Sequence, residues 1–224
     1  MAADELGILL FTLGVAAIAT LLILPPGIAL GLLLARRHFP GKVALETLVT
    51  LPLVLPPVAT GLVLLRLFGR RGGIGTALER VGLEVVFTWR GVVIAMAVMA
   101  LPLLVRGARV AFEAVPPQLE EAARSIGASS RRVFFRVTLP LAGRGIIGGA
   151  LLAFARAVGE FGATILVAGN LPGRTTVLST AIFQAVETGE DPRALRLLAG
   201  AVVLAFGAVA ASEALLRRKG PRHP

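Results

Sequence analysis

The sequence has no cysteine and few charged residues, and both shortages restrict what the protein can be. Without cysteine, its 224 residues can form no disulfide, no thiolate nucleophile and no Cys-ligated metal site. The two histidines, His38 and His223, lie beside basic residues outside the apolar runs, so no metal site or general base is expected at membrane depth. Charged residues make up 16% of the chain, against about a quarter in soluble domains. With 56% hydrophobic residues and a mean hydropathy of +0.84, the chain has too little polar surface for water, and a bilayer is its natural solvent.

Five apolar stretches are long enough to cross the hydrocarbon core of a bilayer, which takes about 20 helical residues. They cover residues 6–35, 43–68, 91–112, 141–169 and 195–216. We therefore expect an all-α, polytopic membrane protein of about five transmembrane helices, forming one transmembrane domain over residues 1–224. The first stretch is too long for the apolar part of a signal peptide and follows Asp4 and Glu5 instead of basic residues, so no cleaved signal is expected.

The distribution of lysine and arginine predicts the orientation. With the N-terminus outside, 14 basic residues fall in cytoplasmic segments and 8 in outer segments, as the positive-inside rule prefers. The inside set includes Arg217, Arg218, Lys219 and Arg222 near the C-terminus. We expect a multi-pass protein of the cytoplasmic membrane, in contact with lipid, with its C-terminus in the cytoplasm. The loop at 66–90 is more basic than the rule prefers. Because most basic residues cap apolar segments, the net charge of +10 does not indicate nucleic acid as a partner.

Prolines interrupt the first two stretches, at Pro25-Pro26 and at Pro52 with Pro56-Pro57. A proline removes a backbone donor and clashes with the preceding turn, so both helices are predicted to kink or break there. Irregular backbone at membrane depth is stable only where protein covers it or where it lines a cavity. Two interpretations stay open: a break that lines a pathway, and an ordinary kink packed against a neighbouring helix.

The segment between the third and fourth stretches differs from the other inside loops. Pro116-Pro117 ends one helix and suits the start of another, and Gly127 is placed to end that second helix. Between them, apolar residues fall on one face at helical spacing: Leu119, Ala122, Ala123 and Ile126. This short amphipathic helix either rests on lipid headgroups or forms a rigid protrusion that a partner can push.

The spacing in this segment carries a family resemblance. Glu121-Ala122-Ala123, three residues, Gly127, nine residues and Val137-Thr138-Leu139-Pro140 together resemble the EAA signature of ABC importer permeases. The resemblance implies the type I ABC importer permease fold, in which this segment, about residues 116–140, forms a coupling helix that docks in a groove of the ATPase. The ATPase-coupling residues implied by position are Glu120, Glu121, Ala122, Ala123, Gly127, Leu139 and Pro140.

The same resemblance implies an assembly. Its parts are a homodimer of permease subunits, a cytoplasmic ABC ATPase dimer that binds ATP-Mg, and an extracytoplasmic oxyanion-binding protein. This chain has no GxxxxGK[ST] phosphate loop, so it is expected to bind no cofactor and to be a transport subunit instead of an enzyme. We expect transport by alternating access. An intramembrane enzyme would need a catalytic constellation that the apolar stretches lack, and a non-transporting scaffold would not require the docking signature.

Four further segments resemble the oxyanion branch of the family, which includes molybdate and sulfate permeases: 39–42, 51–57, 128–142 and 153–175. Gly159–Gly162 is similar to sulfate permeases as well. The short chain without an N-terminal extension, and the run from Asn170 to Thr175 followed by Leu178-Ser179, favour molybdate. The resemblance therefore implies a molybdate permease, with sulfate or thiosulfate as the alternative and tungstate not separable from molybdate.

Arg156 and Glu160 are charged residues within the fourth stretch. Being four residues apart, they share a helix face and can pair, and charges at membrane depth usually face a cavity or a partner. We favour a neutralising pair that locks the span against its neighbour; the alternative places Arg156 along the route of an anion. The predicted pathway and gate positions are Thr60, Gly61, Arg156, Gly159, Glu160, Gly162 and Thr164. Among them, Gly159 and Gly162 permit close helix crossing.

Overall fold

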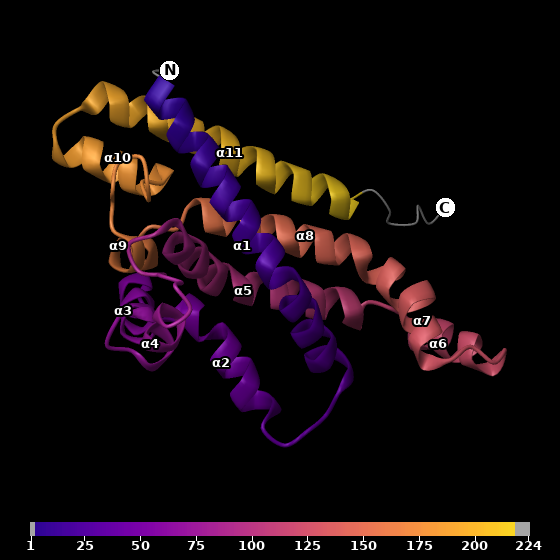
Figure 1. The fold of residues 1–224 in the computed structure, drawn as a ribbon. Coiled ribbons are helices and arrows are strands. Elements are labelled where there is room, and N and C mark those ends of the chain that lie inside the picture. The colour runs from indigo at the N-terminus through magenta and orange to yellow at the C-terminus, as the bar shows by residue number, and fades with distance from the viewer. Residues whose placement is uncertain (1–2, 218–224) are drawn as a thin grey trace.

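The computed structural model describes residues 3–217, in which every regular element is a helix (Figure 1). Four helical segments are long and apolar enough to cross a membrane by length and composition: Asp4–Arg36, Trp89–Glu113, Ser130–Val158 and Asp191–Ala214. They correspond to α1 (Ala3–Arg36), α5 (Trp89–Glu113), α7 to α8, and α11 (Asp191–Arg217). The prediction of an all-α polytopic protein is confirmed. Arg218, Lys219, Arg222 and His223 lie outside the described residues.

The second apolar stretch is not a straight span. It forms α2 (Lys42–Val54) and α3 (Pro57–Phe68), which are bent by 112° relative to each other. The residues between them, Leu55 and Pro56, have extended backbone with ψ of 145° and 132°. A residue before proline is pushed out of the helical region, so two successive prolines extend the break. The break predicted at Pro56-Pro57 is therefore present, and the pair makes a fifth span if it is counted as one.

The first stretch behaves differently, because α1 runs without interruption through Pro25 and Pro26. Close packing against α5 supports the helix on the C-terminal side of these prolines. A Cβ added to Gly27 would fall 2.5 Å from Leu104 Cδ2, and one added to Gly31 would fall 2.6 Å from Ala108 Cβ. Small residues let neighbouring membrane helices approach closely, and this approach stabilises α1 where its own hydrogen bonds are missing.

The fourth stretch, expected at 141–169, begins earlier and ends earlier than predicted. A continuous helical segment runs through α7 (Ser130–Val133), a π-helical turn η1 (Phe134–Thr138) and α8 (Leu139–Val158). The chain then leaves helical geometry and starts again as α9 (Gly162–Ala168). Ser179 Oγ donates to the carbonyl of Glu160 at 2.6 Å, so contact with a distant segment holds the break. Hydropathy alone does not reveal such a break.

The core lies where α1, α5 and α8 pack together, and much of it consists of small side chains. At one crossing, a Cβ on Gly107 of α5 would fall 2.7 Å from Gly149 Cα of α8. Without a hydrophobic driving force between helices in lipid, such close packing supplies the attraction. Three short helices lie outside this core: α4 (Gly73–Glu79), α6 (Pro117–Ser125) and α10 (Leu178–Glu187), of which α10 packs on α1 and α11. Figure 1 shows α6 at the opposite end of the bundle from α4 and α9.

Candidate functional site

The helix α6 has the limits that its sequence predicts. Pro117 occupies its first turn after an extended Pro116, and Gly127 follows its end with φ of +85°. The end is a Schellman motif: Gly127 N–H donates to the Arg124 carbonyl at 2.9 Å, and Ala128 N–H to the Ala123 carbonyl at 3.1 Å. Because glycine adopts a positive φ at little cost, these two bonds form without strain and fix where α6 stops.

One apolar face of α6 is open. Leu119 is 47% and Ile126 is 86% exposed, and Ala122 is exposed between them. The carboxylate of Glu121 is on the exposed surface as well. The amphipathic pattern therefore does not pack this helix against the rest of the chain. An exposed apolar face bordered by charge is typical of a surface that a partner or a membrane covers.

Glu120, although adjacent to Glu121, points into the protein. Its carboxylate is buried and pairs with Arg36 at the end of α1 at 3.0 Å and with Arg124 at 3.4 Å. Thr138 Oγ1, in the π-helical turn, donates to the same carboxylate at 2.7 Å. Successive helix positions face directions about 100° apart, so neighbouring glutamates can have opposite environments. Sequence reasoning grouped Glu120 with the surface residues and missed Arg36 and Thr138.

The last two predicted coupling residues, Leu139 and Pro140, are not on α6. They start α8 directly after the π-helical turn, inside a continuous helical segment in which Pro140 has no N–H to donate to the preceding turn. Leu139 is half-buried and packs on a cluster that includes Phe112, whereas Pro140 is exposed. Both residues lie within the fourth span, and the exposed face of α6 lies elsewhere.

Several predicted pathway residues meet where α3 crosses α9. A Cβ on Gly61 of α3 would fall 2.8 Å from Ala163 Cα, and one on Gly162 of α9 would fall 2.8 Å from Pro57 Cβ. The two helices thus touch through backbone on both sides, although they are about a hundred positions apart in the chain. Both begin at a break, α3 after Pro56 and α9 after Phe161.

The ion pair expected from the spacing of Arg156 and Glu160 is present, with Arg156 Nη1 2.7 Å from Glu160 Oε2. The side chain of Glu160 is 1% exposed and that of Arg156 is 26% exposed. The other carboxylate oxygen of Glu160 accepts the N–H of Ala163 at 2.8 Å, in the first turn of α9. Gly159 ends α8 directly before this glutamate. The carboxylate is therefore neutralised and also holds α9 at its start.

Two buried hydroxyls beside the α3–α9 crossing have no hydrogen-bond partner among the described residues, those of Thr60 and Thr164. Several helical threonines elsewhere in the chain donate to the carbonyl four residues back, as Thr20 does to Ala16 at 2.8 Å. For Thr164 that carbonyl belongs to Glu160, which already accepts from Ser179. An unsatisfied buried polar group costs about 1–3 kcal/mol, so these two hydroxyls are available to a ligand or to water.

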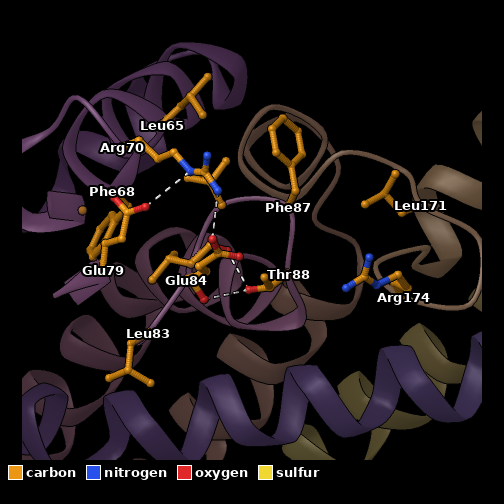
Figure 2. Close-up of a pocket in the computed structure, with 14 residues that line it drawn as sticks. Leu65, Phe68, Arg70, Glu79, Leu83, Glu84, Phe87, Thr88, Leu171 and Arg174 are labelled. Atoms are coloured by element: carbon orange, nitrogen blue, oxygen red, sulfur yellow. Dashed lines mark hydrogen bonds and ion pairs between the residues drawn. The ribbon is translucent and has the colours of Figure 1, made fainter. Parts of the chain in front are cut away.

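An open cavity of ≈ 580 Å³ lies at the α4 and α9 end of the bundle (Figure 2). Arg70 lies between Glu84, at 3.0 Å, and Glu79, at 3.6 Å, and the ion pairs neutralise this part of the basic loop. Arg174, from the loop after α9, lines the other side and has no ion pair among residues 3–217. Phe87 N–H donates to the Val167 carbonyl at 3.0 Å and thereby connects the loop before α5 to α9. Within the described chain, no group of acidic or histidine side chains could hold a metal ion.

Residues 27–217 match the family described as "Binding-protein-dependent transport system inner membrane component". The chain belongs to this family. It is therefore a membrane component of a transport system and not an enzyme.

Individual relatives agree with this family. The chain is 48% identical to the molybdenum transport system permease protein ModB of Escherichia coli, over 93% of this chain and 92% of that one. It is 36% identical to the sulfate transport system permease protein CysT of Salmonella typhimurium, over 80% of this chain and 66% of that one. An inward-facing structure of the MetNI methionine ABC transporter matches with a TM-score of 0.73 at 20% identity, over 97% and 96% of the two chains, which shows the shared permease fold.

Proposed function

We propose that this chain is the permease subunit of an ATP-driven importer that carries molybdate across the cytoplasmic membrane by alternating access. One observation supports molybdate over sulfate. Identity is 48% over 93% of the chain with the molybdenum permease, against 36% over 80% with the sulfate permease. In this proposal residues 1–224 act as one transmembrane domain, with the N-terminus outside and the C-terminus in the cytoplasm.

The open face of α6 is the surface proposed to meet the ATPase. Its exposed leucine and isoleucine can fill an apolar groove, Ala122 and Ala123 permit close approach, and the exposed Glu121 can pair with a basic group. Gly127 ends the helix so that it remains a short, bounded projection. The proposed assembly is a permease homodimer on an ATPase dimer that binds ATP-Mg, fed by an extracytoplasmic oxyanion-binding protein.

The crossing of α3 and α9 is proposed as the gate. Both helices start at breaks, they touch through Gly61 and Gly162, and the unpartnered hydroxyls of Thr60 and Thr164 lie next to that contact. When α3 and α9 separate, these hydroxyls become neutral donors for a passing dianion. The paired Glu160 presents no free negative charge to the anion, and Gly159 and Gly162 let the chain bend on either side of that pair.

Uptake by the reconstituted transporter tests the proposal. The permease, its ATPase and its binding protein are placed in vesicles and supplied with labelled molybdate and ATP. We expect uptake of molybdate that tungstate inhibits and that sulfate at equal concentration leaves unchanged. Absence of molybdate uptake together with uptake of sulfate would instead identify a sulfate permease.

A further inference from the structure

We infer that Glu120 transmits the motion of α6 to two membrane-spanning helices, α1 and α8, and takes no part in the surface that docks on the ATPase. The inference rests on the proposed function, because it assumes that a partner moves α6. It gives Glu120 a role different from that of its neighbour Glu121. The argument depends on which atoms the carboxylate contacts and on how firmly those atoms belong to the spans.

The first contact joins α6 to α1. Arg36, in the last turn of α1, donates to Glu120 Oε1 at 3.0 Å and to the Val115 carbonyl at 3.4 Å. A cation at the C-terminal end of a helix is held there by the helix dipole as well. Glu120 and the carbonyl of Val115 therefore secure this end of α1 to the residues on both sides of Pro116.

The opposite end of α1 is secured too. Arg196 of α11 binds the buried Glu5 through two nitrogens, at 2.7 Å and 3.0 Å, and Arg193 binds Asp4 at 2.9 Å. Between the two ends, α1 carries no charge from residue 6 to residue 35 and packs on α5 and α8. A displacement applied at Arg36 is thus carried by one continuous helix, with its only ionic attachments at the ends.

The second contact joins α6 to the fourth span. Thr138 Oγ1 donates at 2.7 Å to the same oxygen, Oε1, that accepts from Arg36. Thr138 is buried and is the last residue of the π-helical turn, with α8 starting at the next position. A π-helical turn holds an extra residue in the helix and is frequent at functional sites. One carboxylate oxygen therefore binds side chains from two spans.

A buried carboxylate resists any motion that separates it from its partners. Glu120 also pairs through its other oxygen with Arg124, one turn further along α6. An ionised group that loses its partner inside protein is strongly disfavoured, so α6 and the spans are expected to move together. Glu120 is the buried residue of α6, whereas Leu119 and Ala122 on its apolar face are exposed, so the bonds of Glu120 are what hold this helix to the spans.

The first test measures distance. Since the chain has no cysteine, a spin-label pair can be introduced at exposed positions, with Arg37→Cys next to α1 and Ser125→Cys on α6. In the full transporter, we expect the same narrow distance distribution with and without ATP. Adding Glu120→Gln should broaden the distribution or make it change with ATP. An ATP-dependent change in the protein with Glu120 intact would overturn the inference, whatever anion is carried.

The second test measures coupling, as molybdate imported per ATP hydrolysed. Glu120→Gln should leave binding of the ATPase within about twofold and lower the coupling ratio about tenfold. The control Glu121→Gln, exposed on the same helix, should weaken ATPase binding and reduce hydrolysis and uptake together. If Glu120→Gln kept the coupling ratio, or weakened ATPase binding as Glu121→Gln does, the inference would be wrong.

A milder variant covers the case in which Glu120→Gln does not fold. Thr138→Val removes one hydrogen bond to the carboxylate and keeps the side-chain shape, and we expect it to lower the coupling ratio about threefold at normal abundance. An unchanged ratio in that variant would also contradict the inference. If the unmodified transporter imported no molybdate at all, the proposed function would fail, and the distance measurement would still decide the role of Glu120.

Discussion

Gly162 and Pro57 are in contact so close that a Cβ added to the glycine would fall 2.8 Å from the Cβ of the proline. The glycine starts α9 and the proline starts α3, so two helices that both begin at breaks meet at their first residues. The contact leaves no space for any larger side chain unless the backbone moves.

A larger side chain at position 162 should prevent α3 and α9 from touching at their crossing. We expect Gly162→Val to lower molybdate uptake about tenfold or more, because its side chain must push α9 away from the α3 backbone. Initial uptake rates in vesicles, normalised to permease abundance, measure this. Gly143→Val is the matched control, since a Cβ there meets no atom within 4 Å. Equal uptake in both variants would argue against a gate at this position.

Removing the unpartnered hydroxyls should reduce transport without reducing stability. Thr60→Val and Thr164→Val keep the side-chain shape and remove a group with no hydrogen-bond partner among residues 3–217, so the thermal midpoint should stay the same or rise. Uptake should fall several-fold if the hydroxyls assist the anion. By contrast, Thr12 donates to the Ile8 carbonyl and accepts from Leu178 N–H, at 2.7 Å and 2.9 Å. Thr12→Val should therefore cost about 1–3 kcal/mol of stability.

The pair of Arg156 and Glu160 can be tested by a double-mutant cycle. Arg156→Met leaves the buried carboxylate without its cation and should destabilise the protein by about 3 kcal/mol. Adding Glu160→Gln should recover most of that stability. If the pair only stabilises the protein, the uptake of the double variant should recover together with its stability. A stable double variant that transports no molybdate would instead place Arg156 on the route of the anion.

Two glycines with similar backbone allow a matched test of the coupling helix. Gly127 and Gly173 both have positive φ, +85° and +73°, and a Cβ at either would meet nothing within 4 Å. Alanine at each position should cost about 1 kcal/mol of strain. Only Gly127→Ala should lower the uptake per ATP hydrolysed, since it alters the end of α6. Gly127→Arg should insert normally and uncouple more completely. Equal coupling ratios in all these variants would contradict a docking role for this helix end.

Local signals predicted α6 correctly. Two prolines, a run of good helix formers and a glycine three residues after Arg124 specify where it starts and stops, and each acts within one turn of the backbone. The same reasoning could not separate Glu120 from Glu121. Their side chains are adjacent in sequence, and only the positions of Arg36 and Thr138 determine that one carboxylate is buried.

Hydropathy predicted which stretches span the membrane and missed the breaks within them. It measures the mean polarity of a window, and the window around Gly159 is apolar on average despite Arg156 and Glu160. The helix stops there because the carbonyl of Glu160 bonds to Ser179 and its carboxylate bonds to the start of α9. Proline gave a visible signal at Pro56-Pro57, yet the similar signal at Pro25-Pro26 did not end α1, since glycine packing against α5 supports that helix.

Composition and local spacing were enough to predict the membrane class, the approximate spans, the limits of α6 and the family resemblance around Gly127. These properties depend on composition and on backbone preferences that extend over a few residues. Packing of the whole chain places Thr60 and Thr164 beside one crossing and turns Glu120 inward. Those facts depend on contacts between segments far apart in the chain, where packing and the burial of charge determine the direction of each side chain.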